Sequence, residues 1–209
     1  MKIAVVAANG QAGKLITNEA VKRNHDVTAI VRQKNRTEAP KVLQKDLYDL
    51  TFDDLKGFDI VVDAFGVWDP KDMNLHDSSL MHLADCLSET NIKLFVVGGA
   101  GSLYVDDEHK VQLKDTASFP DEAQPVATGM GKALEHLKKR SDVQWVYVSP
   151  ASIFEADGRK TGDYTISDNE YRENSAGESK ISYRDYATAF VDALESEKYN
   201  QVQISIYQN

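Results

Sequence analysis

The residues best suited to chemistry stand near the start of the chain, in the stretch VVAANGQAGK. Gly10 has no Cβ, so its backbone can approach the phosphate groups of a ligand, and Gly13 can let a helix lie close to a strand. A dinucleotide-binding turn usually has one more glycine, but Ala7 stands at that position. An alanine is tolerable there if its φ is negative. The stretch favours a phosphate cradle, with a purely structural strand-to-helix turn as the alternative.

The P-loop, a second kind of phosphate-binding motif, does not fit these residues. It requires glycine where Ala8 stands and serine or threonine where Leu15 stands. We therefore do not expect an ATPase loop in this stretch.

Basic residues follow the next apolar run, in the sequence IVRQKNR. Arg32 and Arg36 supply guanidinium groups, Lys34 adds a third positive charge, and no acidic residue occurs before Glu38. In dinucleotide folds an acidic residue here binds the free ribose 2′-hydroxyl, whereas arginine binds a 2′-phosphate. The segment predicts a preference for NADP(H), with NAD(H) possible. The alternative is a solvated charged loop.

The elements that must position these residues follow from apolar patterning. Val- and Ile-rich runs alternate with helical patterns, and several runs are nearly continuous, which is typical of strands buried on both faces. The runs read KIAVVA, DVTAIV, KVLQKD, DIVVDAFG, KLFVVGG and VQWVYVS. Helical spacing is found from Leu15 to Ala20, from Leu80 to Leu87 and from Met130 to Leu137. The pattern predicts an α/β fold, a doubly wound and mostly parallel Rossmann sheet with right-handed crossovers and helices on both faces.

Two residues mark expected helix ends. Asn24 follows the first helical pattern and tolerates the left-handed conformation that often ends a helix. Ser182 precedes YRDYATAFVDALE, with Asp185 three residues later as a variant of the capping box. A polar segment runs from 151 to 179, and a last alternating strand, VQISIYQ, closes the chain. We expect one domain over 1–209, with a cofactor-binding core at 1–150 and a small substrate-side region at 151–209.

Ligands of such sheets bind beyond the carboxyl ends of the strands, which places AFGVWDP, GGAGSLY and SPASIF around a nicotinamide. Ser102 is the candidate catalytic residue, whose hydroxyl would orient a hydride acceptor; the alternative is a turn-stabilising serine. Phe65 and Trp68 could form an aromatic wall or belong to the core. Pro150 and Ala151 are expected to contact the nicotinamide carboxamide through their backbone. The predicted substrate pocket consists of Trp68, Ser102 and Tyr104.

The Tyr-x-x-x-Lys pair of typical short-chain dehydrogenases is absent. No tyrosine has a lysine four residues later, and the helix where the pair would lie contains Lys132 but no tyrosine. That pair passes a proton to a carbonyl or alcohol, so ordinary ketone chemistry is not expected. A flavin or quinone spreads the arriving charge over its own rings and needs mainly alignment.

Composition excludes several classes of partner. The formal net charge is −9 and no long basic run occurs, so we expect no nucleic acid and no membrane partner. Cys86 is the single cysteine and is expected to be an inert thiol, and no apolar stretch resembles a signal peptide or membrane span. The five histidines lack ligand spacing, so no metal site is expected. We expect a cytoplasmic monomer or homodimer.

Several motifs together resemble a known family. AANGQAG resembles the glycine turn of atypical short-chain dehydrogenases, and DLYDL their adenine-side segment. FVVGGAGSLYV, YVSPASIF and ISYRDYA are similar to the small bacterial NAD(P)H-binding proteins called NADH-flavin reductases. The resemblance covers nearly the whole chain and implies a Rossmann fold, a nicotinamide cofactor and reduction of a flavin or quinone. The expected cofactor-binding residues are Ala7, Asn9, Gly10, Gln11, Ala12, Gly13, Arg32, Arg36, Asp46, Leu47, Ala64, Phe65, Gly66, Gly98, Gly99, Lys132, Pro150 and Ala151.

Two functions are compatible with these residues. The first is an NADPH-preferring oxidoreductase with flavin as a possible substrate, and the second is a non-catalytic NADP(H)-sensing regulator resembling the NmrA-like group. The loop from 103 to 128 could be a lid or a partner-docking surface.

Overall fold

An eight-stranded sheet forms the centre of the computed structural model, which describes residues 1–209. The strand order is β3-β2-β1-β4-β5-β6-β10-β8, and all neighbours are parallel except β8, which is antiparallel to β10. These strands are β1 (Lys2–Val6), β2 (Asp26–Val31), β3 (Lys41–Gln44), β4 (Ile60–Asp63), β5 (Lys93–Val97), β6 (Gln144–Pro150), β8 (Tyr164–Ser167) and β10 (Val202–Gln208). The doubly wound, mostly parallel α/β sheet predicted from the sequence is confirmed.

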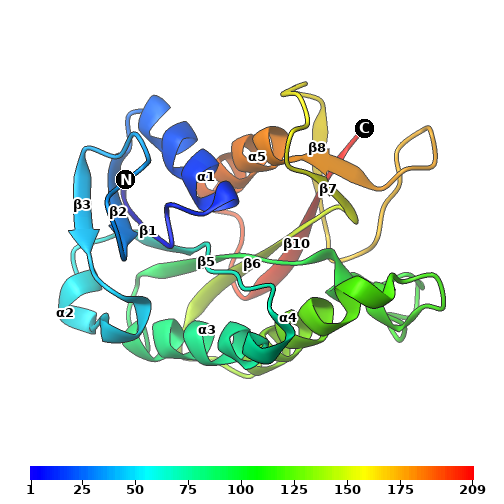
Figure 1. Ribbon diagram of the computed structural model, residues 1–209, viewed down its shortest axis with the longest axis horizontal. Helices are drawn as coiled ribbons and strands as arrows, with labels where there is room; N and C mark the ends of the chain where they lie inside the picture. Colours follow the sequence, from blue (N-terminus) through cyan, green and yellow to red (C-terminus); the bar gives the residue numbers. More distant parts are fainter.

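Helices cover both faces of the sheet, as Figure 1 shows. Helices α1 (Gln11–Lys22) and α5 (Tyr183–Glu195) lie side by side on one face. Helices α3 (Asn74–Cys86) and α4 (Gln124–Leu137) lie on the other, and a short α2 (Phe52–Leu55) precedes β4. Five 3-10 helices lie in the loops: η1 (Leu47–Asp49), η2 (Pro70–Asp72), η3 (Ala100–Ser102), η4 (Leu113–Asp115) and η5 (Asp121–Ala123).

Strand residues alternate between two apolar clusters, one on each face of the sheet. Ile3 and Val5 of β1 join the cluster of 25 buried residues beneath α1 and α5, whereas Ala4 and Val6 join the cluster of 20 beneath α3 and α4. Each fully buried Val or Ile side chain contributes about 1.5–3 kcal/mol relative to exposure. The near-continuous apolar runs of the sequence therefore reflect strands that bury both faces.

Helix α1, which carries the glycine turn, is also fixed by ion pairs to α5. The Arg23 guanidinium lies 2.7 Å from both Asp192 and Glu195 of α5, and its Nε lies 3.0 Å from Glu19. The Arg23 Nη2 also donates to the Thr188 carbonyl. A guanidinium with this many partners holds two helices in one relative position more firmly than an exposed pair would.

Both expected helix ends are present. Asn24 has a φ of 63° and ends α1, as predicted. Ser182 caps α5 by accepting a hydrogen bond from the Asp185 N–H. The Asp185 carboxylate, however, does not return to the backbone N–H of Ser182 as in a capping box. It accepts hydrogen bonds from the backbone of Thr161 and Gly162, which ties that loop to the start of α5.

The region after β6 contains structure that the sequence pattern did not predict. Besides β8, it contains β7 (Ile153–Glu155) and β9 (Lys180–Ser182), which pair in parallel as a separate two-stranded sheet. The β6–α5–β10 connection also has the opposite hand to the other crossovers, because α5 lies on the α1 face while β10 lies on the side of β6 away from β1. The expectation that every crossover is right-handed is therefore wrong for this one, in which the long segment 151–182 intervenes before the helix.

The loop that the sequence predicts after β5, from 103 to 128, is shorter in the structure. Helix α4 begins at Gln124, so residues 124–128 are helical, and η4 and η5 lie before it.

No helix in the structure combines the length and the hydropathy that crossing a bilayer requires.

Candidate functional site

The strand order reverses between β1 and β4, which lie side by side in parallel. The chain leaves β1 toward β2 on one side and leaves β4 toward β5 on the other, so the carboxyl ends of β1 and β4 flank the switch point where open α/β sheets bind ligands. The turn before α1 and the segment after β4 meet there. Ala64 donates its N–H to the Val6 carbonyl, and the Ala64 carbonyl lies 3.9 Å from where a Cβ of Gly10 would be.

The two glycines of the turn have different surroundings. A Cβ at Gly13 would lie 2.7 Å from the Ala7 carbonyl oxygen and 3.1 Å from Ala8 Cα, so only glycine lets α1 approach the end of β1 this closely. Gly10 is exposed, and its Cβ would meet nothing nearer than the Ala7 oxygen at 3.3 Å. Gly13 thus serves packing, whereas Gly10 keeps the surface of the turn open.

The amino end of α1 offers unpaired N–H groups at this surface. Gly10 is the N-cap, no side chain caps the helix, and no acidic residue occurs in its first turn. A helix beginning without a cap or an acid leaves its first N–H groups and the positive end of its dipole available to an anion. The backbone of 10–13 therefore presents a surface that is compatible with an anionic group such as a pyrophosphate.

The backbone of Ala7 does not meet the condition of a negative φ. Its φ is 56°, in the left-handed region, whereas an alanine was expected to be tolerable only with a negative φ. The Gly10 N–H donates to the Ala7 carbonyl at 2.9 Å, and this tight turn requires the positive φ. The conformation costs an alanine about 1 kcal/mol or more relative to glycine.

Asn9 joins the glycine turn to the arginine segment. Its Nδ2 donates to the Lys34 carbonyl at 3.0 Å, and its Oδ1 accepts from the Arg36 N–H at 2.8 Å. Arg32 and Arg36 are both exposed, and the Arg32 guanidinium lies 4.0 Å from Asp46 with 76% of its side chain accessible. The structure therefore brings the predicted phosphate cradle and the predicted 2′-phosphate site to one edge. No sequence pattern pointed to this bridging role of Asn9.

Of the two residues expected to bind on the adenine side, Asp46 is partly accessible and Leu47 is buried. Asp46 caps η1 by accepting from the Tyr48 N–H, and it is partly accessible. Leu47 is 7% exposed and packs into the apolar cluster under α3 and α4, so its side chain supports this edge from below.

At the edge expected to face the nicotinamide, the glycines differ in whether a Cβ would find space. Gly98 packs against the Tyr147 ring, where a Cβ would lie 2.2 Å from the ring, and a Cβ at Gly99 would lie 3.0 Å from the Met130 sulfur. Gly66 has nothing within 4 Å of a Cβ. Gly66 is exposed and borders open space, Ala64 and Phe65 are half-buried, and Gly98 is required by packing. Pro150 and Ala151 end β6 at the same edge of the sheet and are buried.

Ser102 faces the protein interior, whereas the sequence predicts that it faces a hydride acceptor. It is 3% exposed, and its hydroxyl donates to the Gly99 carbonyl at 3.3 Å. The Gln203 Nε2 donates to Ser102 Oγ at 2.9 Å and to Ser149 Oγ at 3.1 Å. No sequence signal pointed to Gln203, because it lies 101 residues from Ser102 and enters the network only through β10. In this arrangement Ser102 links η3 to the sheet.

The other predicted pocket residues do not gather around Ser102. Trp68 is 75% exposed in the segment after β4. The Tyr104 ring is stacked on His109 with centroids 4.8 Å apart, and the Lys138 ammonium lies 5.8 Å from its centroid. Lys132 was expected to contact the cofactor. In the structure it is exposed, and its ammonium forms an ion pair with Asp77 of α3 at 3.3 Å.

A buried carboxyl group lies beneath this edge. Asp63 ends β4, is 4% exposed, and accepts a hydrogen bond from the Phe65 N–H at 3.0 Å. Burial raises the pKa of Asp63 to about 6, and the single backbone hydrogen bond offsets only part of that rise. A small pocket of about 10 Å³ lies between Asp63 and other polar groups, among them His76 and the unpartnered hydroxyl of Tyr147.

We expect Asp63→Asn to stabilise the protein above pH 6. The folded-state pKa is raised from 3.8 to about 6, so the native state binds more protons than the unfolded chain in this window, and wild-type stability falls as pH rises through it. The ionised group costs about 3 kcal/mol above the window. Because an asparagine amide is also costly to bury, the gain at about pH 8 should be about 2 kcal/mol, with almost none at about pH 4.

Urea unfolding at both pH values measures this difference. Asp185→Asn is the matched control: burial would raise the Asp185 pKa, but hydrogen bonds from Gly162, Thr161 and Ser182 lower it overall. That carboxylate stabilises the fold above its unfolded pKa and loses its contribution as pH falls, so its replacement should destabilise at about pH 8. A loss of stability in Asp63→Asn at that pH would contradict the assignment of a strained buried charge.

Comparison with known proteins gives consistent matches along the chain. A family model described as NAD(P)H-binding matches residues 7–197. The uncharacterized protein YwnB of Bacillus subtilis (strain 168) is 40% identical over 209 residues, covering 99% of this chain and 98% of that protein. A crystal structure from Streptococcus pneumoniae TIGR4, named a putative NADH-flavin reductase, is 45% identical with a TM-score of 0.98 and full coverage of both chains. A protein of Bacteroides thetaiotaomicron named as an epimerase candidate is 30% identical, with a TM-score of 0.87, covering 99% of this chain and 96% of that one.

Proposed function

Since the chain belongs to the NAD(P)H-binding family, we propose that it is an oxidoreductase that prefers NADPH and passes hydride to a flavin or quinone-like acceptor. One observation carries this proposal. The open, uncapped start of α1 is joined through Asn9 to the exposed segment of Arg32 and Arg36. A backbone phosphate cradle beside two exposed guanidinium groups suits a dinucleotide that carries a third phosphate.

The chain's own residues would hold the cofactor in three places. The backbone of 10–13 would bind the pyrophosphate, and Arg32 and Arg36 would bind the 2′-phosphate. The ends of β4 and β6, at 64–66 and at 150–151, would border the nicotinamide. When bound, the nicotinamide supplies the hydride. The exposed Trp68 follows the same edge and offers an aromatic surface on which a flat acceptor could stack.

The choice of acceptor follows from the polar groups near this edge. The chain has no Tyr-x-x-x-Lys pair, and Ser102, Asp63 and Tyr147 are all less than 5% exposed. A carbonyl acceptor needs a proton from a positioned donor, whereas a flavin or quinone mainly needs alignment. The same burial favours, as a second candidate, a regulator that binds NADP(H) without turning it over. In either case we expect a cytoplasmic protein that acts with small molecules.

Mixing the purified protein with NADPH and a panel of acceptors tests this function. We expect oxidation of NADPH with flavins or quinones and very little with aldehydes, ketones or sugars, measured as the decrease in nicotinamide absorbance. The Gly10→Val variant serves as the control and should show no turnover. Tight NADPH binding without turnover of any acceptor would instead favour the regulator, and rapid turnover of a simple ketone would contradict the choice of acceptor.

A further inference from the structure

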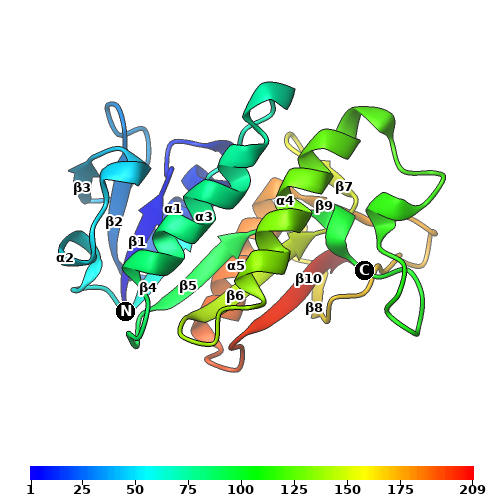
Figure 2. The ribbon, with the colours of Figure 1, turned by 90° about the horizontal axis from the view of Figure 1, so that it is seen from below.

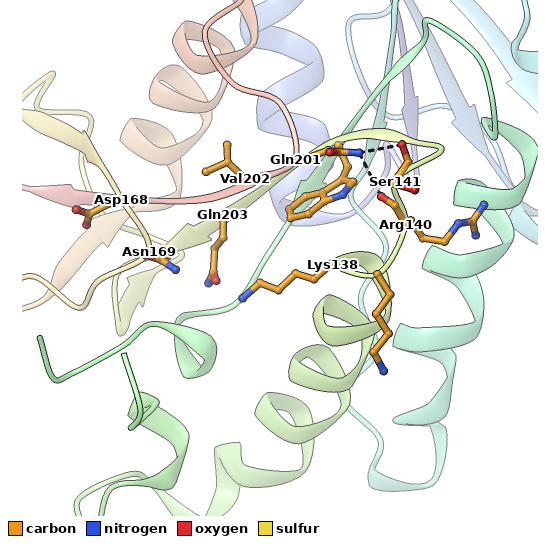
Figure 3. A pocket seen from close by; sticks show the side chains of 10 residues that line it. Lys138, Arg140, Ser141, Asp168, Asn169, Gln201, Val202 and Gln203 are labelled. Atoms are coloured by element: carbon orange, nitrogen blue, oxygen red, sulfur yellow. Dashed lines mark hydrogen bonds between the residues drawn. The ribbon is translucent and has the colours of Figure 1, made fainter. Parts of the chain in front are cut away.

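A second pocket lies at the opposite edge of the sheet from the glycine turn. It is bordered by the segment between α4 and β6, by the amino end of β10 and by the segment after β8, and its volume is about 430 Å³ (Figure 3). Figure 2 shows that β10 and β8 extend beyond α4, so no α-helix covers them on this face. A volume of this size is within the range of small-molecule sites.

The wall of this pocket is fixed by its own hydrogen bonds. The Gln201 Nε2 donates to the carbonyls of Arg140, Ser141 and Val143 at 3.1–3.3 Å, which holds the segment before β6 against the start of β10. The Arg140 guanidinium is turned outward and bonds to Asp85 and Asp142. These hydrogen bonds fix the shape of the pocket wall, and its arginine is already neutralised.

Lys138 and Lys139 both line the pocket without an ion-pair partner, and we assign the anion contact to Lys138. It forms no ion pair or hydrogen bond in the structure, and in Figure 3 its side chain extends toward Gln203. Desolvation lowers the pKa of Lys138, and nearby Glu135 only partly opposes this effect. Lys138 is an exposed residue whose ammonium is desolvated only in part by neighbouring protein atoms, and an ammonium without a counterion gains from a bound anion.

Two neighbouring residues also carry unpaired polar atoms. Trp145 and Gln203 are each 3% exposed, and the Trp145 Nε1 and the Gln203 Oε1 are both buried without a hydrogen-bond partner. Four such side-chain atoms occur in the structure, and two of them belong to residues that line this pocket. Buried polar atoms in folded proteins are almost always paired, so an unpaired donor and acceptor beside a cavity point to a ligand that completes them after small side-chain shifts.

We propose that this pocket binds a small organic oxyanion, either a carboxylate or a phosphate monoester. The oxyanion lies against the Lys138 ammonium, with the Trp145 N–H as a further donor. A hydroxyl of the ligand reaches Gln203 Oε1, and its apolar part rests on Trp145 and Val202. Asp168 lies on the opposite wall of the pocket and pairs with Arg172 at 3.7 Å. Its negative charge disfavours a ligand that carries a second anionic group away from the first. The proposal does not depend on the function of the cofactor edge.

The indole N–H of Trp145 provides a direct probe of binding. The chain has two tryptophans, so Trp68→Phe leaves Trp145 as the only indole, and its NMR cross-peak reports on this pocket alone. We would titrate this protein with benzoate, with phenyl phosphate and with the neutral benzamide, before and after saturation with NADPH. We expect a saturable shift with at least one of the two anions, with a Kd below about 10 mM, and none with benzamide.

Matched lysine variants test the role assigned to Lys138. Lys138→Gln should raise the Kd of the bound anion about tenfold, the loss expected for a charge-assisted contact. Lys198→Gln removes the same charge from the exposed segment before β10, outside the pocket, and should change the Kd less than about threefold. Benzoate alone would identify a carboxylate site and phenyl phosphate alone a phosphate site. No saturable shift with either anion, equal binding of benzamide, equal Kd values in the two lysine variants, or displacement by NADPH would each overturn the proposal.

Discussion

Gly10→Val should abolish NADPH binding while leaving the fold nearly as stable as in the wild type. The new side chain would begin 3.3 Å from the Ala7 carbonyl oxygen and 3.9 Å from the Ala64 carbonyl oxygen, contacts that a small backbone shift can relieve. Its two methyl groups, however, would occupy the surface to which the first N–H groups of α1 point. A pyrophosphate could then no longer approach the backbone, and we expect affinity to fall by at least about 100-fold.

Calorimetry with NADPH and thermal unfolding without it separate the two effects. Gly57→Val is the matched control, because a Cβ at Gly57 meets nothing within 4 Å and the residue lies before β4, at the other edge of the sheet. That variant should bind NADPH like the wild type. Gly13→Ala should instead lower the stability of the fold, since its Cβ would lie 2.7 Å from the Ala7 oxygen. Unchanged NADPH binding in Gly10→Val would reject the cradle.

Replacing both Arg32 and Arg36 by alanine should weaken NADPH binding by about 2–4 kcal/mol and leave NADH binding nearly unchanged. Only NADPH carries the 2′-phosphate, so only its affinity depends on groups that bind this phosphate. The two side chains are exposed, and Asn9 holds the backbone of their segment next to the glycine turn. Asp46, 4.0 Å from Arg32, competes weakly for that guanidinium.

Titrations with both cofactors at two salt concentrations measure this selectivity. The double variant Arg159→Ala/Arg172→Ala removes the same charge from the C-terminal region and serves as the control, with little effect on either cofactor expected. The NADPH affinity of the wild type should also decrease with salt more steeply than that of the Arg32/Arg36 variant. Equal losses for NADPH and NADH would remove the basis for a preference between them.

Features that depend on neighbouring residues in the chain could be predicted from the sequence alone. Apolar runs that are continuous rather than alternating predicted the parallel strands, because such strands bury both faces. Asn24 and Ser182 marked helix ends because capping is a local interaction between a residue and the adjacent backbone. The need for glycine at position 13 also followed from a strand that runs directly into a helix.

Features that depend on residues far apart in the chain were decided by the tertiary structure. Ser102 faces inward because β10 places Gln203 within hydrogen-bond distance of its hydroxyl. Lys132 pairs with Asp77 because α3 and α4 pack together. The packing of α1 and the tight turn before it set the positive φ of Ala7. The second pocket likewise exists only because β10 returns beside β6 while α5 lies on the other face. Local patterns specify which segments become strands and helices, but the burial of side chains contributed by distant segments decides which groups remain free to bind a ligand.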